Sequence, residues 1–187
     1  MSECILRPMR PTDLPAVLEI QAQCYRGMLL ESGAALASRL TLSPATCWVA
    51  AHAGQNETLA AYLFTHMWPQ DSLPSLDGVL ERHWDRSDEP GRISAKPAVT
   101  LTWFVHDMAV APAGQGKGLA QRLYKAARAA ALDAGLRSSR LVAVQSAAPW
   151  WRRLGYEKMA SANDAFDAKL SAYGADAVLM GRVLQPA

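Results

Sequence analysis

The sequence lacks several features that mark whole classes of proteins. It has three cysteines in 187 residues with no CxxC spacing, which argues against a zinc site or a disulfide framework and favours reduced thiols. No basic segment followed by an apolar run opens the chain, and no stretch approaches the roughly 20 apolar residues of a membrane span. The formal net charge of +2 gives no reason to expect a nucleic-acid or membrane partner. We therefore expect a soluble, cytoplasmic protein without a metal site.

The composition that is present is that of one globular domain. Half of the residues are hydrophobic and 19% are charged, and the length allows a single domain over residues 1–187 with a sizeable core. No internal repeat or second domain is visible. The sequence leaves the oligomeric state open, a homodimer included.

The order of the predicted elements indicates an α/β fold. Alternating or short apolar runs predict strands over residues 5–9, 47–51, 59–64, 98–110, 141–144, 156–159 and 177–184. Helical spacing with caps and breakers predicts helices over residues 12–25, 28–42, 118–134 and 149–155. This order predicts a central mixed sheet of about seven strands flanked by helices. Segment 67–97, rich in Pro, Asp, Ser and Gly, is expected to be a functional loop, a binding lid or a disordered stretch.

The most informative segment joins the strand that ends at Val110 to the helix that begins at Gly118. A glycine-dense turn there bares main-chain N–H groups at a helix N-terminus, where the partial positive charge favours a phosphate. The order Gln115-x-x-Gly118-x-Ala120 lacks the final Lys-Ser/Thr of an ATP-binding P-loop. Its third small residue also comes too early for a dinucleotide-binding fingerprint. The segment therefore predicts a phosphate site that is neither an ATP-binding P-loop nor a dinucleotide-binding loop.

The same order resembles the pyrophosphate loop of the GCN5-related N-acetyltransferase (GNAT) superfamily. Residues 108–112 (Met-Ala-Val-Ala-Pro) resemble the family's strand before this loop, and residues 148–156 resemble its second motif, aromatic-x-x-x-Gly-aromatic. The resemblance implies the GNAT acyltransferase fold, with acetyl-CoA as co-substrate and no metal. In the family, the strand's main chain pairs with the pantetheine arm and the loop holds the pyrophosphate. The cofactor-binding residues implied here are Met108, Ala109, Val110, Gln115, Gly116, Lys117, Gly118, Leu119, Ala120 and Trp151.

Acetyl transfer to an amine needs a base that removes the ammonium proton. Histidine has the side-chain pKa nearest to neutrality, and His106 lies on the strand that leads into the loop. Strand alternation predicts that His106 shares one face with Phe104, Met108 and Val110, while Asp107 lies on the other. We predict His106 as the base, acting through water, and Asp107 as the alternative base or orienting group. The competing interpretations are a hydrogen-bonded core histidine and a carboxylate that caps nearby amides.

The fate of the leaving thiolate is a separate question. In many relatives a tyrosine stands four residues before the glycine of the second motif, but this position is Trp151, whose indole N–H is not a useful acid. Trp151 is expected to pack against pantetheine or in the core. Tyr173 and Tyr156 are candidate acids, with Tyr173 preferred; a thiolate whose thiol has a pKa near 8.5 also leaves without one. Because no cysteine lies near these motifs in the sequence, we expect direct attack in a ternary complex.

Within the superfamily, the sequence is most similar to the arylalkylamine (serotonin-type) N-acetyltransferases. The similarity lies in residues 105–110 (Val-His-Asp-Met-Ala-Val) and 40–44 (Leu-Thr-Leu-Ser-Pro). In that group, a histidine at the place of His106 belongs to the path of proton removal. The sequence departs from the group's Cys-Pro-Leu loop, with Leu29-Leu30-Glu31 near that place. The resemblance implies acetyl transfer to the primary amine of a small molecule.

Other acceptors remain open. A protein N-terminus, a lysine or a polyamine is one alternative, and a non-catalytic acyl-CoA-binding domain is another. Residues that are candidates for an apolar acceptor site are Tyr25, Met28, Trp68 and Trp84. Carboxylates that are candidates for attracting a cationic amine are Glu31, Asp71 and Asp85.

Overall fold

The computed structural model describes residues 4–25, 29–54, 57–84, 99–161 and 163–186. Seven strands form one sheet in the order β1-β2-β3-β4-β5-β7-β6. Their bounds are β1 Cys4–Pro8, β2 Trp48–His52, β3 Leu59–Pro69, β4 Leu101–Val110, β5 Ser138–Ala143, β6 Glu157–Lys158 and β7 Val178–Val183. All neighbouring strands are antiparallel except β4 and β5, which are parallel. The predicted mixed sheet of about seven strands is confirmed.

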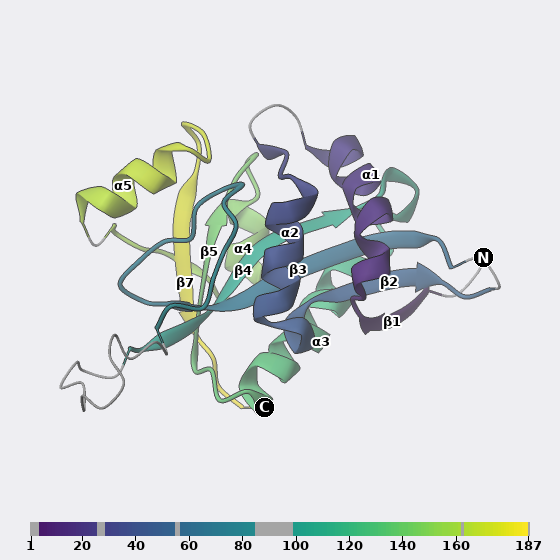
Figure 1. The fold of residues 1–187 in the computed structure, drawn as a ribbon, viewed down its shortest axis with the longest axis horizontal. Coiled ribbons are helices and arrows are strands. Elements are labelled where there is room, and N and C mark those ends of the chain that lie inside the picture. Colours follow the sequence, from purple (N-terminus) through teal and green to yellow (C-terminus); the bar gives the residue numbers. More distant parts are fainter. Residues whose placement is uncertain (1–3, 26–28, 55–56, 85–98, 162, 187) are drawn as a thin grey trace.

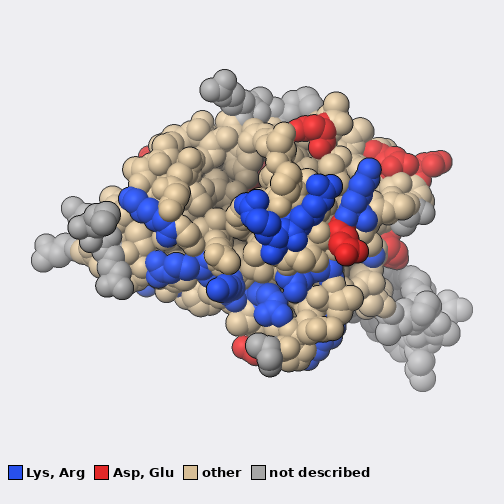
Figure 2. Space-filling model, turned by 180° about the vertical axis from the view of Figure 1, so that it is seen from behind, with Lys and Arg blue, Asp and Glu red and all other residues tan. Residues whose placement is uncertain are grey.

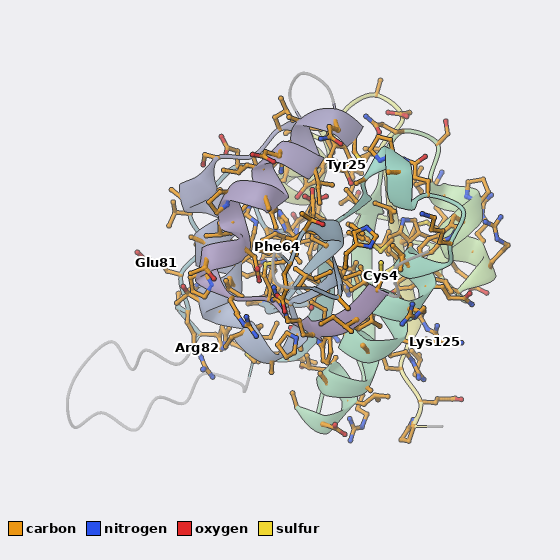
Figure 3. The ribbon with its side chains drawn as sticks, turned by 90° about the vertical axis from the view of Figure 1, so that its right-hand side faces the viewer. Cys4, Tyr25, Phe64, Glu81, Arg82 and Lys125 are labelled. Carbon is orange, nitrogen blue, oxygen red and sulfur yellow. The ribbon has the colours of Figure 1, made fainter. Side chains whose placement is uncertain are left out.

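Helices cover both faces of this sheet (Figure 1). Helices α1 (Leu14–Cys24) and α2 (Gly33–Leu42) pack on one face, and α3 (Leu119–Asp133) and α4 (Ala148–Arg153) on the other. The end-on view in Figure 3 shows Tyr25 and Phe64 on the side of α1 and α2, and Lys125 on α3 across the sheet. Helix α5 (Asp164–Ser171) and the short 3₁₀ turns Pro11–Asp13, Pro44–Thr46 and Pro112–Gly114 complete the fold.

The structure differs from the prediction most clearly at β3, α2 and α5. Strand β3 continues to Pro69, so the first residues of the expected loop 67–97 belong to the sheet. The following residues 70–84 pack against the α2 side of the sheet, with Leu73 only 1% exposed. Helix α2 begins at Gly33 because the Ser32 side chain accepts a hydrogen bond from the Ala35 N–H, five residues after the predicted start. Helix α5, which was not predicted, is capped in the same way by Asn163.

Candidate active site

A cavity opens where the parallel strands β4 and β5 separate. Their pairing covers only Trp103–Val105 against Ser139–Leu141, while β4 continues to Val110. Beyond the last pair, the main chain of β4 lines a cavity of about 370 Å³. Such a volume is at the lower end of the range for small-ligand pockets, roughly 300–1,000 Å³. The cavity is therefore built on the strand that leads into the glycine-rich turn.

Six of the predicted cofactor-binding residues line this cavity: Met108, Ala109, Val110, Gln115, Ala120 and Trp151. The other predicted residues, from Gly116 to Leu119, form the turn and the start of α3. Gly116 and Gly118 have φ values of +76° and +71°, in the left-handed region that only glycine adopts without strain. Gly118 is the N-cap of α3, and no side chain caps this helix. Its first-turn N–H groups are therefore open to an anion.

Lysine and arginine side chains gather on the face that carries α3 and α4 (Figure 2). Exposed cations on these elements and the preceding turn include Lys117, Arg122, Lys125, Arg152 and Arg153. A surface of one charge raises the local concentration of oppositely charged ligands. The positive face thus supports the phosphate site at the start of α3.

A β-bulge in β4 overturns the predicted placement of His106 and Asp107. Phe64 of β3 pairs with Asp107 and the next residue pairs with Val105, so His106 is an extra residue in the ladder. The His106 ring contacts His66, and the Asp107 carboxylate contacts Tyr62, and both partners lie on the face covered by α1 and α2. The prediction of opposite faces is therefore wrong. The bulge resets the alternation, so Met108 and Val110 point toward α3 instead of sharing a face with His106.

Asp107 is a buried carboxylate beside the cavity. Its Oδ2 atom accepts a hydrogen bond of 2.7 Å from the Tyr62 hydroxyl, and Gln21 Nε2 lies 3.5 Å away. Burial raises the pKa of Asp107 above its usual value, although the Tyr62 hydrogen bond acts in the opposite direction. No Lys or Arg of the described residues forms an ion pair with it. Asp107 is therefore suited to take a proton.

His106 is held in a buried charge network. Its Nε2 lies 3.0 and 3.1 Å from the two carboxylate oxygens of Glu31, and its Nδ1 lies 3.3 Å from His66 Nε2. Glu31 in turn pairs with Arg39 at 2.5 Å, and the side chains of His106 and Arg39 have no exposed surface. Burial favours a raised pKa at Glu31, but His106 and Arg39 outweigh it and the pKa lies below its usual value. Both His106 ring nitrogens are thus occupied.

Comparisons with known proteins agree with this geometry. Residues 79–158, which include β4, α3, β5 and α4, match the family model of the Acetyltransferase (GNAT) domain. The matched segment, residues 79–158, thus has the sequence of a GNAT domain. A search of curated protein sequences gives no match to it. The match supports acetyl transfer from acetyl-CoA as the general activity of this domain.

Solved structures share the GNAT fold at low sequence identity. Rv2747 from Mycobacterium tuberculosis, solved with CoA, is 15% identical, with a TM-score of 0.65 over 97% of this chain and 99% of that chain. The ribosomal-protein-S18-alanine N-acetyltransferase of Escherichia coli is 17% identical, with a TM-score of 0.59 over 99% and 96%. A polyamine N-acetyltransferase of Drosophila melanogaster is 14% identical, with a TM-score of 0.62 over 98% and 100%. Their names include protein and polyamine acceptors, so the shared fold leaves the acceptor of this GNAT protein open.

The residues considered in connection with proton donation to the leaving thiolate lie at different depths. Tyr173 lines the cavity and donates a hydrogen bond of 3.3 Å to the Pro74 carbonyl, and burial raises its pKa. Trp151 lines the cavity and also packs in the core against Tyr124. Tyr156 lies in the core instead, 2.6 Å from the Ser139 hydroxyl. Of the two candidate tyrosines, only Tyr173 therefore lies at the cavity.

One cysteine lies closer to the site than the sequence indicated. The Cys24 thiol donates to the Val110 carbonyl at 3.3 Å, and Cys24 lines the cavity, so the expectation that no cysteine lies near the motifs is wrong in space. Burial, and then the charge of Asp107, raise the pKa of this thiol. A protonated thiol is a poor nucleophile, so this cysteine gives no support to a covalent intermediate.

Few of the residues expected to bind the acceptor amine line the cavity. Tyr25 lines the cavity and donates a hydrogen bond of 2.8 Å to the Met108 carbonyl. Trp68 and Trp84 pack edge to face against each other away from the cavity lining, and Asp71 is exposed outside it. Met28 and Asp85 lie outside the described residues. Glu31 lines the cavity, but its charge is already paired.

Sequence reasoning missed the residues that hold the acceptor side together. Arg39 lies on the buried face of α2 with Leu36 and Leu40, and it donates to the main chain of Ser75 and Gly78. Its signal was a charged residue inside an apolar helical stripe, since a fully buried arginine requires partners. Leu29, Leu76 and Gln145, which also line the cavity, carried no comparable signal.

The described residues also bear on two broader expectations. No helix within the described ranges is long and apolar enough to cross a membrane. No group of three or more His, Cys, Asp or Glu side chains in the same ranges is arranged to hold a metal ion.

Proposed function

We propose that this GNAT protein transfers acetyl from acetyl-CoA to the primary amine of a small molecule, by direct attack while both substrates are bound. The observation that carries the proposal is Asp107: a buried carboxylate that lines the cavity, pairs with no Lys or Arg among the described residues and lies on the strand that leads to the phosphate loop. An ammonium group supplies the missing positive charge, and the carboxylate then removes its proton.

The walls around Asp107 favour a compact, mainly apolar amine. Leu29, Leu76 and Tyr173 come from three separate segments and line the cavity. A second free carboxylate, which a polyamine requires for its far end, is not available at Glu31, because Arg39 and His106 neutralise it. The arylalkylamine resemblance and these walls support the same class: one cationic nitrogen on an apolar body.

The chain's own groups divide the chemistry between them. Asp107, with its pKa raised by burial, takes the ammonium proton, and the free amine then attacks the thioester carbonyl. The main chain of Met108 and Val110 beyond the last β5 pair faces the cavity and is available to bind the pantetheine arm and polarise that carbonyl. Tyr173 is the proposed proton donor to the thiolate because, of the two candidate tyrosines, it is the one whose side chain lines the cavity.

The structure favours Asp107 over His106 as the base. His106 also lines the cavity, but both of its ring nitrogens have partners, so no lone pair is free to accept a proton from an amine. We therefore assign the proton transfer to Asp107 and treat His106 as its buried neighbour.

The test is thiol release from acetyl-CoA across arylalkylamines, polyamines, amino acids, aminoglycosides and peptides with free N-termini. Saturable turnover with phenylethylamine or tryptamine, and little with spermidine, is the expected result. Turnover with peptides or polyamines alone would replace the small-amine proposal. Acetyl-CoA binding with no turnover across the panel would favour a non-catalytic acyl-CoA-binding domain.

A further inference from the structure

A count of hydrogen atoms along the buried chain of His66 and His106 gives their shared protonation state. His66 Nδ1 lies 3.2 Å from the Met67 carbonyl oxygen, which only accepts, so this nitrogen carries a hydrogen. His106 Nε2 lies 3.0 Å from Glu31, whose lowered pKa keeps it an ionised acceptor, so this nitrogen also carries one. The contact between the two rings, 3.3 Å long, needs a third hydrogen.

Two neutral imidazoles carry two N–H hydrogens in total, whereas these three contacts require three. We propose that His66 and His106 together hold one proton more than two neutral rings, and that this positive charge makes His106 a positioning residue for Asp107 rather than a base. His66 acts as the acceptor that keeps the His106 Nδ1–H satisfied. The role toward Asp107 rests on the proposed function, whereas the proton count does not.

The surroundings balance this charge and place it on His106. The Glu31 carboxylate lies 3.0 Å from His106 Nε2, whereas His66 faces the Met67 carbonyl, so we place the extra proton on His106. Burial, and then the neighbouring His106, lower the pKa of His66, which agrees with a neutral His66 ring. Charged or titratable groups that face the pair come from the adjoining elements: Glu31 before α2, Arg39 on α2, Asp107 on β4 and Tyr173 before β7. Segment 70–84 contributes the main-chain N–H of Asp77, which donates to Glu31. The two cations, His106 and Arg39, thus face two carboxylates, Glu31 and Asp107.

The charge on His106 has a direct consequence for the base. A positive charge on the neighbouring residue and on the same sheet face favours the ionised form of Asp107 and offsets part of the effect of burial. Loss of that charge raises the pKa of Asp107. Because a base works only when ionised, activity is then lost at a higher pH as the solution is acidified.

Nitrogen-15 NMR of the histidine side chains tests the proton count without any substrate. The chain has four histidines, and the spectrum of His66→Gln assigns the pair. At neutral pH we expect His106 protonated at both nitrogens and His66 at Nδ1 alone. A His106 ring with a single proton would overturn the proposal.

Two substitutions at His66 test the link to Asp107, with an amine that the enzyme acetylates. In His66→Gln the amide oxygen still accepts from His106 Nδ1, whereas His66→Phe fills the space beside Phe104 without an acceptor. We expect the acid limb of the kcat/KM profile to move up by roughly one pH unit in His66→Phe, and to return toward the unaltered position in His66→Gln. If the acid limbs of His66→Phe and His66→Gln lie at the same pH, the positioning role of His106 is contradicted. Thermal melting and acetyl-CoA affinity establish that both variants are folded. If the proton count holds but no amine is acetylated, the proposed function fails alone.

Discussion

The cofactor half of the cavity is made of main chain and glycine, whereas the acceptor half is made of side chains from separate segments. On the first side, the end of β4 and the uncapped start of α3 present peptide groups from one continuous stretch of sequence. On the second, Glu31, Arg39 and Asp107 come from three different elements; Glu31 pairs with Arg39, and Gln21 links the main chain of Glu31 to Asp107. The difference predicts that the halves fail independently when they are changed.

The largest expected effect belongs to the acceptor half. In Asp107→Asn the amide cannot take the ammonium proton, so kcat should fall by about 100-fold or more while acetyl-CoA affinity stays within about twofold. Steady-state kinetics with both substrates varied measures this. Because the pKa of Asp107 is raised, the unaltered enzyme should lose activity as the pH falls through a value above that of an ordinary aspartate.

The matched control for this change is Asp133→Asn, at an exposed carboxylate at the end of α3. It alters the net charge equally without touching the cavity, so its kinetics should equal those of the unaltered protein. A full kcat in Asp107→Asn would remove Asp107 from the proton path.

A smaller effect is expected on the cofactor half. Gly118→Val places a side chain where the pyrophosphate approaches the start of α3, so acetyl-CoA affinity should fall about tenfold with the acceptor KM unchanged. Gly135→Val is the control, because Gly118 and Gly135 have φ values of +71° and +84° and an added Cβ meets nothing within 4 Å at either. Both variants should lose about 1–2 kcal/mol of stability from backbone strain. Equal acetyl-CoA affinities in the two variants would contradict the loop assignment.

The smallest effect is expected from changing Arg39, which joins segments on the acceptor side of the cavity. Arg39 joins Glu31 to the carbonyls of Ser75 and Gly78, and the single ammonium of Arg39→Lys cannot keep all of these contacts. We expect the acceptor KM to rise a few fold and stability to fall by about 2 kcal/mol, with acetyl-CoA affinity retained. Arg152→Lys, at an exposed position on α4, is the control.

Unfolding experiments at acid pH should also reveal the contribution of the Glu31–Arg39 pair to stability. The folded pKa of Glu31 is depressed, so its contribution to stability is present at neutral pH and is lost as the pH falls through that folded value. In Arg39→Lys, with a weaker partner, the loss should begin at higher pH. Denaturant unfolding across acid pH measures both curves.

The contrast also explains what can be predicted from the sequence. The strand, the glycine turn and the following helix are local features, so the sequence alone predicts them over residues 108–120, where the fold has them. The bulge at His106 is not visible in the sequence, because an extra residue in β4 is defined only against its partner strand β3. The same limit hides the contacts of His66 and Arg39, which join elements that no sequence pattern brings together.

Calorimetric titration of CoA into the unaltered protein, Asp107→Asn and Gly118→Val tests the separation of the two halves most directly, since it needs no knowledge of the acceptor. We predict that Asp107→Asn binds CoA as tightly as the unaltered protein and that Gly118→Val binds it about tenfold more weakly. Weakened CoA binding in Asp107→Asn, or unchanged binding in Gly118→Val, would contradict this separation.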